Sequence, residues 1–247
     1  MIVATALPGI PEVAAGDDLA ALIARASGRL SDGDVLVLAH KVVSKSEGRV
    51  VALAGVEPSE RARTLAVEHG KDPRLLEVIL GECEAVVRSR PGVLICRTHH
   101  GFVCANAGVD TSNAPREGDV VLLPLDPDAS ARALRARLRE LTGGAVAIVI
   151  SDSFGRAWRV GQCDVAIGVA GLGPVEDWRG RRDGGGRRLE ATVIAIADQA
   201  AAAADLARGK DSREPVVLVR GLERHVSESD GPGAAVLVRA RGEDLFS

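Results

Sequence analysis

The chain has 247 residues, 46% of them hydrophobic, so it can bury a sizeable core as one large or two small domains. Its net charge of −3, from 31 basic and 34 acidic residues, argues against a dedicated nucleic-acid-binding protein. Because no apolar run could span a bilayer and the N-terminus lacks a signal-peptide pattern, we expect a cytoplasmic protein that binds no membrane, with four free cysteines.

Apolar runs and amphipathic segments follow one another irregularly along the chain. In chain order we expect a helix over 17–26, a strand over 35–39, helices over 58–69 and 72–80, an antiparallel meander around Val86, Leu94 and Val103, a strand over 119–123, a helix over 126–141, a strand over 145–150, a helix over 197–208, and strands over 215–219 and 234–238. This order indicates an α+β fold with mixed or antiparallel sheets and interspersed helices.

Two acidic segments follow apolar runs and carry the main functional signal. Asp110 lies in Asn106-Ala-Gly-Val-Asp110-Thr-Ser-Asn113, and Asp152 lies in Ser151-Asp152-Ser153. Each aspartate alone is explained as a cap of a turn or helix. If the two converge, with a neighbouring hydroxyl, they form an oxygen-lined site for a hard divalent cation that serves nucleotide phosphates.

Basic residues follow the first expected strand, in the segment 40–48. His40, Lys41 and Lys45 are placed there to meet phosphate, although a solvated strand exit explains them equally well. The chain contains neither the G-x-x-x-x-G-K-[ST] loop nor a G-x-G-x-x-G turn after a strand. A nucleotide enzyme built on this sequence must therefore hold phosphates in another way.

Two further segments have alternative interpretations. The segment Cys96 to Cys104, with His99 and His100, resembles soft-metal ligand spacing, but the second ligand pair of a zinc site is missing, and hydrogen-bonded or substrate-contacting histidines are the other interpretation. The glycine- and arginine-rich segment 179–188 is expected to be a mobile basic loop that either meets an anionic substrate or stays solvated.

Several motifs occur together in the order of one known family. They are Pro8-Gly9-Ile10-Pro11-Glu12, Gly16-Asp17-Asp18, Asp32-Gly-Asp34, the segment 40–48, Ala107 to Asn113, and Ser151 to Arg156. In these motifs, from about residue 2 to about residue 221, the sequence closely resembles the coenzyme F420-0:L-glutamate ligase (F420:gamma-glutamyl ligase) family.

The resemblance implies a GTP-dependent ligase that adds L-glutamate to F420-0, or its dehydro form, through an acyl phosphate, and then further gamma-linked glutamates. It implies Mg²⁺ or Mn²⁺, assistance by K⁺, and an unusual fold in which two-domain monomers intertwine as a homodimer, so residues 1–247 form one ligase unit with two subdomains. The alternatives are another metal-dependent, nucleotide-using phosphotransferase and a non-catalytic small-molecule-binding protein.

By position in the motifs, the resemblance also implies site residues. Asp110, Asp152 and Ser153 correspond to metal ligands, and Lys45 is expected to act with the two aspartates in catalysis. The implied nucleotide contacts are Ile10, Pro11, Glu12, Val13, His40, Lys45, Asn113, Gly209 and Lys210.

Three departures from the family pattern bear on these expectations. Ser153 stands where many relatives have threonine, which keeps the hydroxyl, and Asp198-Gln199 stands where Asp-Glu is common, which puts an acidic role there in doubt. The fused C-terminal flavin-binding reductase domain of some relatives has no counterpart in this sequence, so we expect ligation only.

Overall fold

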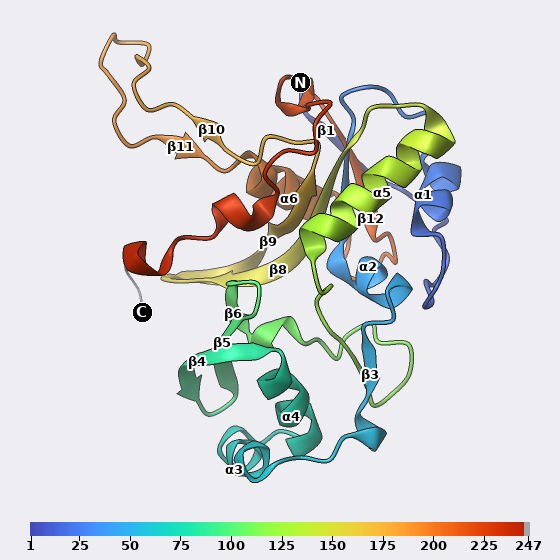
Figure 1. Cartoon of the computed structure of the whole chain (residues 1–247), viewed down its shortest axis with the longest axis vertical. Helices are drawn as coiled ribbons and strands as arrows, with labels where there is room; N and C mark the ends of the chain where they lie inside the picture. Colours follow the sequence, from blue (N-terminus) through green and yellow to red (C-terminus); the bar gives the residue numbers. More distant parts are fainter. Residues whose placement is uncertain (245–247) are drawn as a thin grey trace.

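A five-stranded mixed sheet forms the centre of the computed structural model, which describes residues 1–244 (Figure 1). β2 and β8 are parallel neighbours, whereas every other neighbouring pair in this sheet is antiparallel. In spatial order the strands are β1 (Val3–Ala6), β12 (Val216–Arg220), β2 (Val35–Ala39), β8 (Ala147–Arg156) and β9 (Arg159–Ala170). The predicted mixed α+β architecture is confirmed.

Both faces of the sheet are buried, which explains why its central strands are continuous apolar runs. Leu36, Leu38 and Ile148 face a cluster formed with α1 (Leu19–Ser27) and α5 (Pro127–Thr142). The alternate residues of β2 and β8 pack on the opposite face against the alanines of α6 (Ile196–Ala207). The small alanine side chains bring α6 close to the sheet.

A second group of elements, between β2 and α5 in the sequence, has its own hydrophobic cluster. Figure 1 shows it below the large sheet. Leu76, Ile79 and Leu94 are fully buried in this cluster. The elements are β3 (Val50–Ala52), paired with β7 (Asp119–Val121), helices α3 (Glu60–His69) and α4 (Pro73–Gly81), and the sheet of β4 (Cys83–Arg90), β5 (Val93–Thr98) and β6 (Val103–Ala105).

The predicted helix ends correspond closely to local capping geometry. Ser59 caps α3 by accepting a hydrogen bond from the Ala62 amide, and Gly70 ends the helix in the left-handed conformation. The antiparallel meander predicted around Val86, Leu94 and Val103 is confirmed as β4, β5 and β6. Asp18, rather than Asp17 or Gly16, caps α1.

One expectation from the sequence was wrong: residues 234–238 do not form a strand. Ala234–Leu237 is a 3₁₀ turn, and the amide of Ala234 bonds the Asp128 carboxylate instead of a strand partner. The segment 179–188 contains no helix or strand, as expected; it forms the end of a hairpin that has β10 (Glu176–Asp177) and β11 (Val193–Ile194) at its base and an isolated bridge between Arg182 and Arg188. Figure 1 shows this hairpin projecting from the body.

Besides the 3₁₀ turns, six described elements had no counterpart in the sequence-based prediction: β1, the short helix α2 (His40–Ser46), β3, β9, β10 and β11. Of these, α2 and β9 carry residues of the candidate site. Within residues 1–244, no helix combines the length and apolar character needed to cross a membrane.

Candidate functional site

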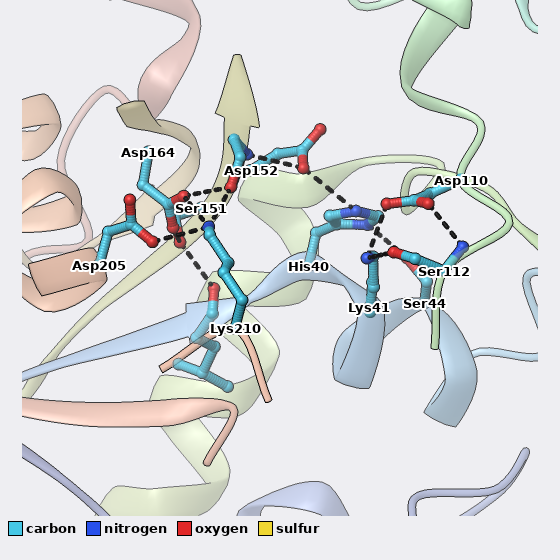
Figure 2. A network of polar contacts seen from close by, with 12 residues as sticks. His40, Lys41, Ser44, Asp110, Ser112, Ser151, Asp152, Asp164, Asp205 and Lys210 are labelled. Carbon is cyan, nitrogen blue, oxygen red and sulfur yellow. Dashed lines mark hydrogen bonds and ion pairs between the residues drawn. The ribbon is translucent and has the colours of Figure 1, made fainter. Parts of the chain in front are cut away.

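Polar residues come together where the parallel pairing of β2 with β8 ends, at one edge of the large sheet. β2 ends at Ala39, opposite Ser151 of β8. Helix α2 begins at the next residue, His40, while β8 continues through Asp152. As a result, His40 Nε2 lies 3.4 Å from Asp152 Oδ1 (Figure 2).

His40 and Asp152 are both shielded from solvent, and each favours its neutral form more than usual. Burial lowers the pKa of His40, against the opposing charge of Asp152. Burial also raises the pKa of Asp152, and the charges of Asp110 and Asp164 raise it further, against lowering contributions from His40 and from the Ser153 amide. Among the described residues, His40 Nε2 has no hydrogen-bond partner. A buried nitrogen of this kind is commonly satisfied by water or a ligand.

Asp110 reaches the same edge from the other group of elements and meets Lys41. The Lys41 ammonium lies 2.6 Å from Asp110 Oδ2 and donates to Ser112 Oγ at 2.7 Å. Burial alone would raise the pKa of Asp110, but hydrogen bonds from Lys41 and from the Ser112 amide outweigh it and lower the pKa. Asp110 is therefore a carboxylate at neutral pH.

An unusual stretch of backbone places Asp110. Asn106, Ala107 and Gly108 have φ values of 53°, 54° and 74°, in the left-handed region that non-glycine residues rarely adopt. Lys71 donates to the Asn106 side chain at 2.9 Å, and the Asp110 amide bonds the Val121 carbonyl at 3.0 Å. Strain of this kind persists where the surrounding structure holds it, commonly at functional sites.

Ser153 joins a buried polar network on the other side of Asp152. Its hydroxyl donates to Asp164 Oδ1 at 2.6 Å and accepts from Lys210 at 2.9 Å. Asp164 Oδ2 accepts from Ser151 at 2.8 Å and is paired with the Arg208 guanidinium. The side chain of Asp164 is fully buried. This network connects β8, β9 and the segment after α6.

The remaining predicted contacts are distributed around this edge. Lys45, 5% exposed, forms an ion pair with the exposed Glu12. The side chains of Ile10 and Val13 are buried in the main core, so only their main chain can meet a ligand. Three further predicted nucleotide contacts are exposed: Pro11, Asn113 and Gly209.

The histidines of the meander bond main-chain carbonyls. His99 Nε2 lies 3.1 Å from the Gly81 carbonyl oxygen, and His100 Nε2 lies 2.9 Å from that of Pro124. Burial raises the pKa of Cys96 to about 12, which keeps this thiol protonated and a poor metal ligand. The hydrogen-bonded interpretation is confirmed, the cysteines are free, and no group of three or more His, Cys, Asp or Glu within residues 1–244 is arranged to hold a metal.

Two charged residues of this edge, Asp164 and Arg208, were absent from the predicted site. Lys41 was expected to meet phosphate as part of the segment 40–48, which directly follows a buried strand. Asp164 had no such signal, because Gly161 and Gly168 interrupt the apolar pattern of β9 and the strand itself was not predicted. Without β9, nothing in the sequence relates Asp164 to Ser153.

The chemistry of the edge suits a hard cation and an anionic ligand together. Asp110, Asp152 and Ser153 offer carboxylate and hydroxyl oxygens, the donors that Mg²⁺ and Mn²⁺ prefer. Two carboxylates are too few for a complete protein-only site, and phosphate oxygens and water commonly fill the remaining positions around Mg²⁺. Lysines 41, 45 and 210 add positive charge nearby. The arrangement can accommodate a cation and an anionic ligand side by side.

Comparison with known proteins places the chain in one family. Residues 9–221 match the family described as F420-0:Gamma-glutamyl ligase. The chain is 49% identical to the coenzyme F420:L-glutamate ligase of Methanopyrus kandleri, over 95% of this chain and 93% of that protein. It is 46% identical to the proteins of the same name from Methanothermobacter thermautotrophicus, covering 96% of each chain, and Archaeoglobus fulgidus, covering 87% of this chain and 85% of that one.

The match spans most of the chain, and identity is far above the level at which only a fold is shared. The chain therefore belongs to the F420-0:gamma-glutamyl ligase family, and it is a ligase.

Proposed function

We propose that this protein joins L-glutamate to the carboxylate of coenzyme F420-0 and then adds further glutamates through gamma-linkages, using GTP. Membership of the ligase family supports the joining of glutamate to F420-0. The gathering of Asp110, Asp152, Ser153 and the lysines where the parallel pairing of β2 with β8 ends supports the use of a phosphoanhydride. Such a cosubstrate is needed because a carboxylate is too poor an electrophile to react with an amine.

In the proposed reaction, a carboxylate oxygen of F420-0 attacks the γ-phosphorus of GTP, which releases GDP and gives an acyl phosphate. The glutamate amine then attacks the acyl carbon, the amide forms, and inorganic phosphate leaves. A divalent cation, Mg²⁺ or Mn²⁺, held by Asp110, Asp152 and Ser153, supplies charge stabilisation on the transferring phosphoryl group. We also propose that K⁺ assists the reaction, as the family resemblance implies.

The chain's own cations have a defined task in this scheme. Lys45 is held in place by Glu12, and Lys41 by Asp110 and Ser112, so both ammonium groups are ordered before a ligand arrives. Preorganised positive charge stabilises the charge that develops during phosphoryl transfer. His40 Nε2 lies 3.4 Å from Asp152 Oδ1 but makes no hydrogen bond within the described part, so it can donate one to a ligand oxygen.

The projecting hairpin is proposed to contact the anionic parts of F420-0 or glutamate. Arg179 is paired with Asp177, and Arg181 with Glu176, whereas Arg187 and Arg188 are exposed near the tip. Replacing Arg187 and Arg188 by glutamine should therefore raise KM for F420-0 or glutamate with little change in kcat, because binding charge is lost away from the reacting atoms. Steady-state kinetics with each substrate varied would measure this.

The matched control for the hairpin variant is a glutamine double variant of Arg61 and Arg63, which are exposed on α3. It removes the same charge elsewhere and should leave both KM values unchanged. Equal kinetics for the two double variants would remove the hairpin from substrate binding.

Product analysis tests the function directly. Purified protein is incubated with GTP, Mn²⁺, L-glutamate and F420-0, and the products are examined by mass spectrometry. We expect F420 species heavier by one or more glutamyl residues, with GDP and phosphate released only when both acceptor and glutamate are present. GTP turnover with F420-0 alone would favour another phosphotransferase, and nucleotide binding without turnover would favour a binding protein.

Self-association completes the proposal: we propose a homodimer in which neighbouring chains intertwine. The tip of the β8–β9 hairpin exposes Trp158 and Val160, at 88% and 99% of their surface, and a partner chain would cover apolar surface of this kind. Sedimentation of the purified protein would give its mass in solution.

A further inference from the structure

The hydroxyl of Ser153, a proposed cation ligand, is held in one direction by its hydrogen bond to Asp164. Its proton is donated to Asp164 Oδ1 at 2.6 Å, so its lone pairs face away from Asp164, and one accepts from the exposed Lys210 at 2.9 Å. A serine hydroxyl has one proton and two acceptor lone pairs. In this arrangement, the Ser153 hydroxyl has only acceptor character left to offer a ligand.

Asp164 is itself held in one orientation. It is the cross-strand partner of Ser153 in the β8–β9 ladder, and its other oxygen is occupied by Ser151 and by the Arg208 guanidinium. Arg208 also donates to the Pro215 carbonyl oxygen at 3.1 Å. This hydrogen bond joins the two ends of the segment 208–215, which carries Lys210. The side chain of Asp164 is fully buried and that of Arg208 is 9% exposed, so the pair is shielded from competing water.

We propose that Asp164 is a positioning residue that acts through Ser153: it fixes the hydroxyl so that its oxygen lone pairs, and not its proton, face the proposed divalent cation. The inference rests on the cation site of the proposed function. Because Asp164 places Ser153 and is bound to Arg208, it also links the cation site to the segment that carries Lys210. Residues behind the ligands of a metal commonly change its affinity about ten- to a hundredfold when replaced.

The isosteric variant Asp164→Asn reverses the hydrogen bond. Arg208 and Ser151 both donate to one oxygen of Asp164, so the amide oxygen of asparagine must stay on that side and its NH₂ must face Ser153. The Ser153 hydroxyl then becomes an acceptor from the amide, and its proton turns toward the cation site. We expect Mn²⁺ affinity to fall about ten- to a hundredfold.

Mn²⁺ is added to the full-length protein without substrates, and free Mn²⁺ is followed by electron paramagnetic resonance, with thermal unfolding measured on each sample. Ser153→Ala should weaken binding by a similar factor, and adding Asp164→Asn to it should weaken binding no further, because both act through one hydroxyl. Thr64→Ala is the control: it removes an exposed hydroxyl on α3, which bonds only the Glu60 carbonyl oxygen among the described contacts, and it should leave Mn²⁺ affinity unchanged.

A second variant covers the case in which Asp164→Asn leaves Arg208 buried without its counter-charge and fails to fold. Asp164→Leu combined with Arg208→Met removes both charges together, which proteins tolerate better than loss of one partner. Ser151 retains a contact to the Leu38 carbonyl at 3.4 Å, and Ser153 loses its acceptor. We expect weak Mn²⁺ binding here too.

The outcomes separate the two proposals. Two results would overturn the positioning role and leave the cation site standing. One is wild-type Mn²⁺ affinity in the folded Asp164 variants. The other is a double variant, Asp164→Asn with Ser153→Ala, that binds Mn²⁺ more weakly than either single variant. A wild-type protein that binds no Mn²⁺ would overturn the cation site, and the positioning role with it.

Discussion

Asp152→Asn and Asp110→Asn are each expected to lower kcat for F420-0 glutamylation by at least about a hundredfold. Both carboxylates are at the edge where the parallel pairing of β2 with β8 ends, and the proposed cation there would stabilise the transferring phosphoryl group by several kcal/mol. Asparagine keeps the volume and removes the charge, so the loss measures electrostatics rather than packing. Single-turnover kinetics with saturating GTP, glutamate and F420-0 would isolate the chemical step.

The matched control is Asp126→Asn, at the N-terminus of α5. Asp126 accepts a hydrogen bond from the Ala129 amide at 2.8 Å, and asparagine caps a helix about as well as aspartate. This variant loses one negative charge without disturbing the fold and should retain full activity. If the Asp110 and Asp152 variants were as active as this control, the proposed cation site would be wrong.

Gly168→Ala is expected to lower the free energy of unfolding by at least about 2 kcal/mol, because the added methyl group meets rigid main chain. A Cβ at Gly168 of β9 would lie 2.3 Å from the Pro127 carbonyl oxygen at the start of α5. The same junction is fixed by the Asp128 carboxylate, which accepts from the Val169 amide at 2.8 Å. Denaturant unfolding followed by circular dichroism would measure the change.

Gly155→Ala provides the comparison within the same strand pair. Among the described residues, no atom lies within 4 Å of a Cβ at Gly155, which is exposed on β8. Alanine also restricts the unfolded chain more than glycine, so stability should be unchanged or slightly higher. Equal stability of the two alanine variants would show that α5 moves away from β9 at little cost.

The parts of the fold that could be predicted are those in which local chemistry and burial agree. The run 35–39 is apolar throughout because both faces of β2 are covered, and Gly70 ends α3 because the chain must turn left-handed there. The run 234–238 looked equally strand-like, but a short apolar run does not distinguish a strand from another buried segment. Only tertiary packing decides that Ala234 bonds Asp128.

The candidate site was foreseeable only where function-bearing residues directly follow a recognisable strand. His40 and Asp152 do so, and the parallel pairing of β2 with β8 brings them together. Helix α2 was missed because it has seven residues, includes the β-branched Val42 and Val43, and lacks a side-chain cap. The acidic role left in doubt at Asp198 also depends on packing: its carboxylate bonds the Ala166 amide of β9.

Asp152 and Ser153 belong to a strand with a fixed register, and this limits how the gene can change length. Ser151 pairs with Ala39 on one side, and Ser153 pairs with Asp164 on the other. An insertion or deletion between 147 and 153 would turn every later side chain to the opposite face of the sheet. At the turn between Arg156 and Arg159 the same event alters only an exposed tip. Among related proteins, insertions and deletions in this hairpin should therefore occur at its tip and be removed by selection from its base.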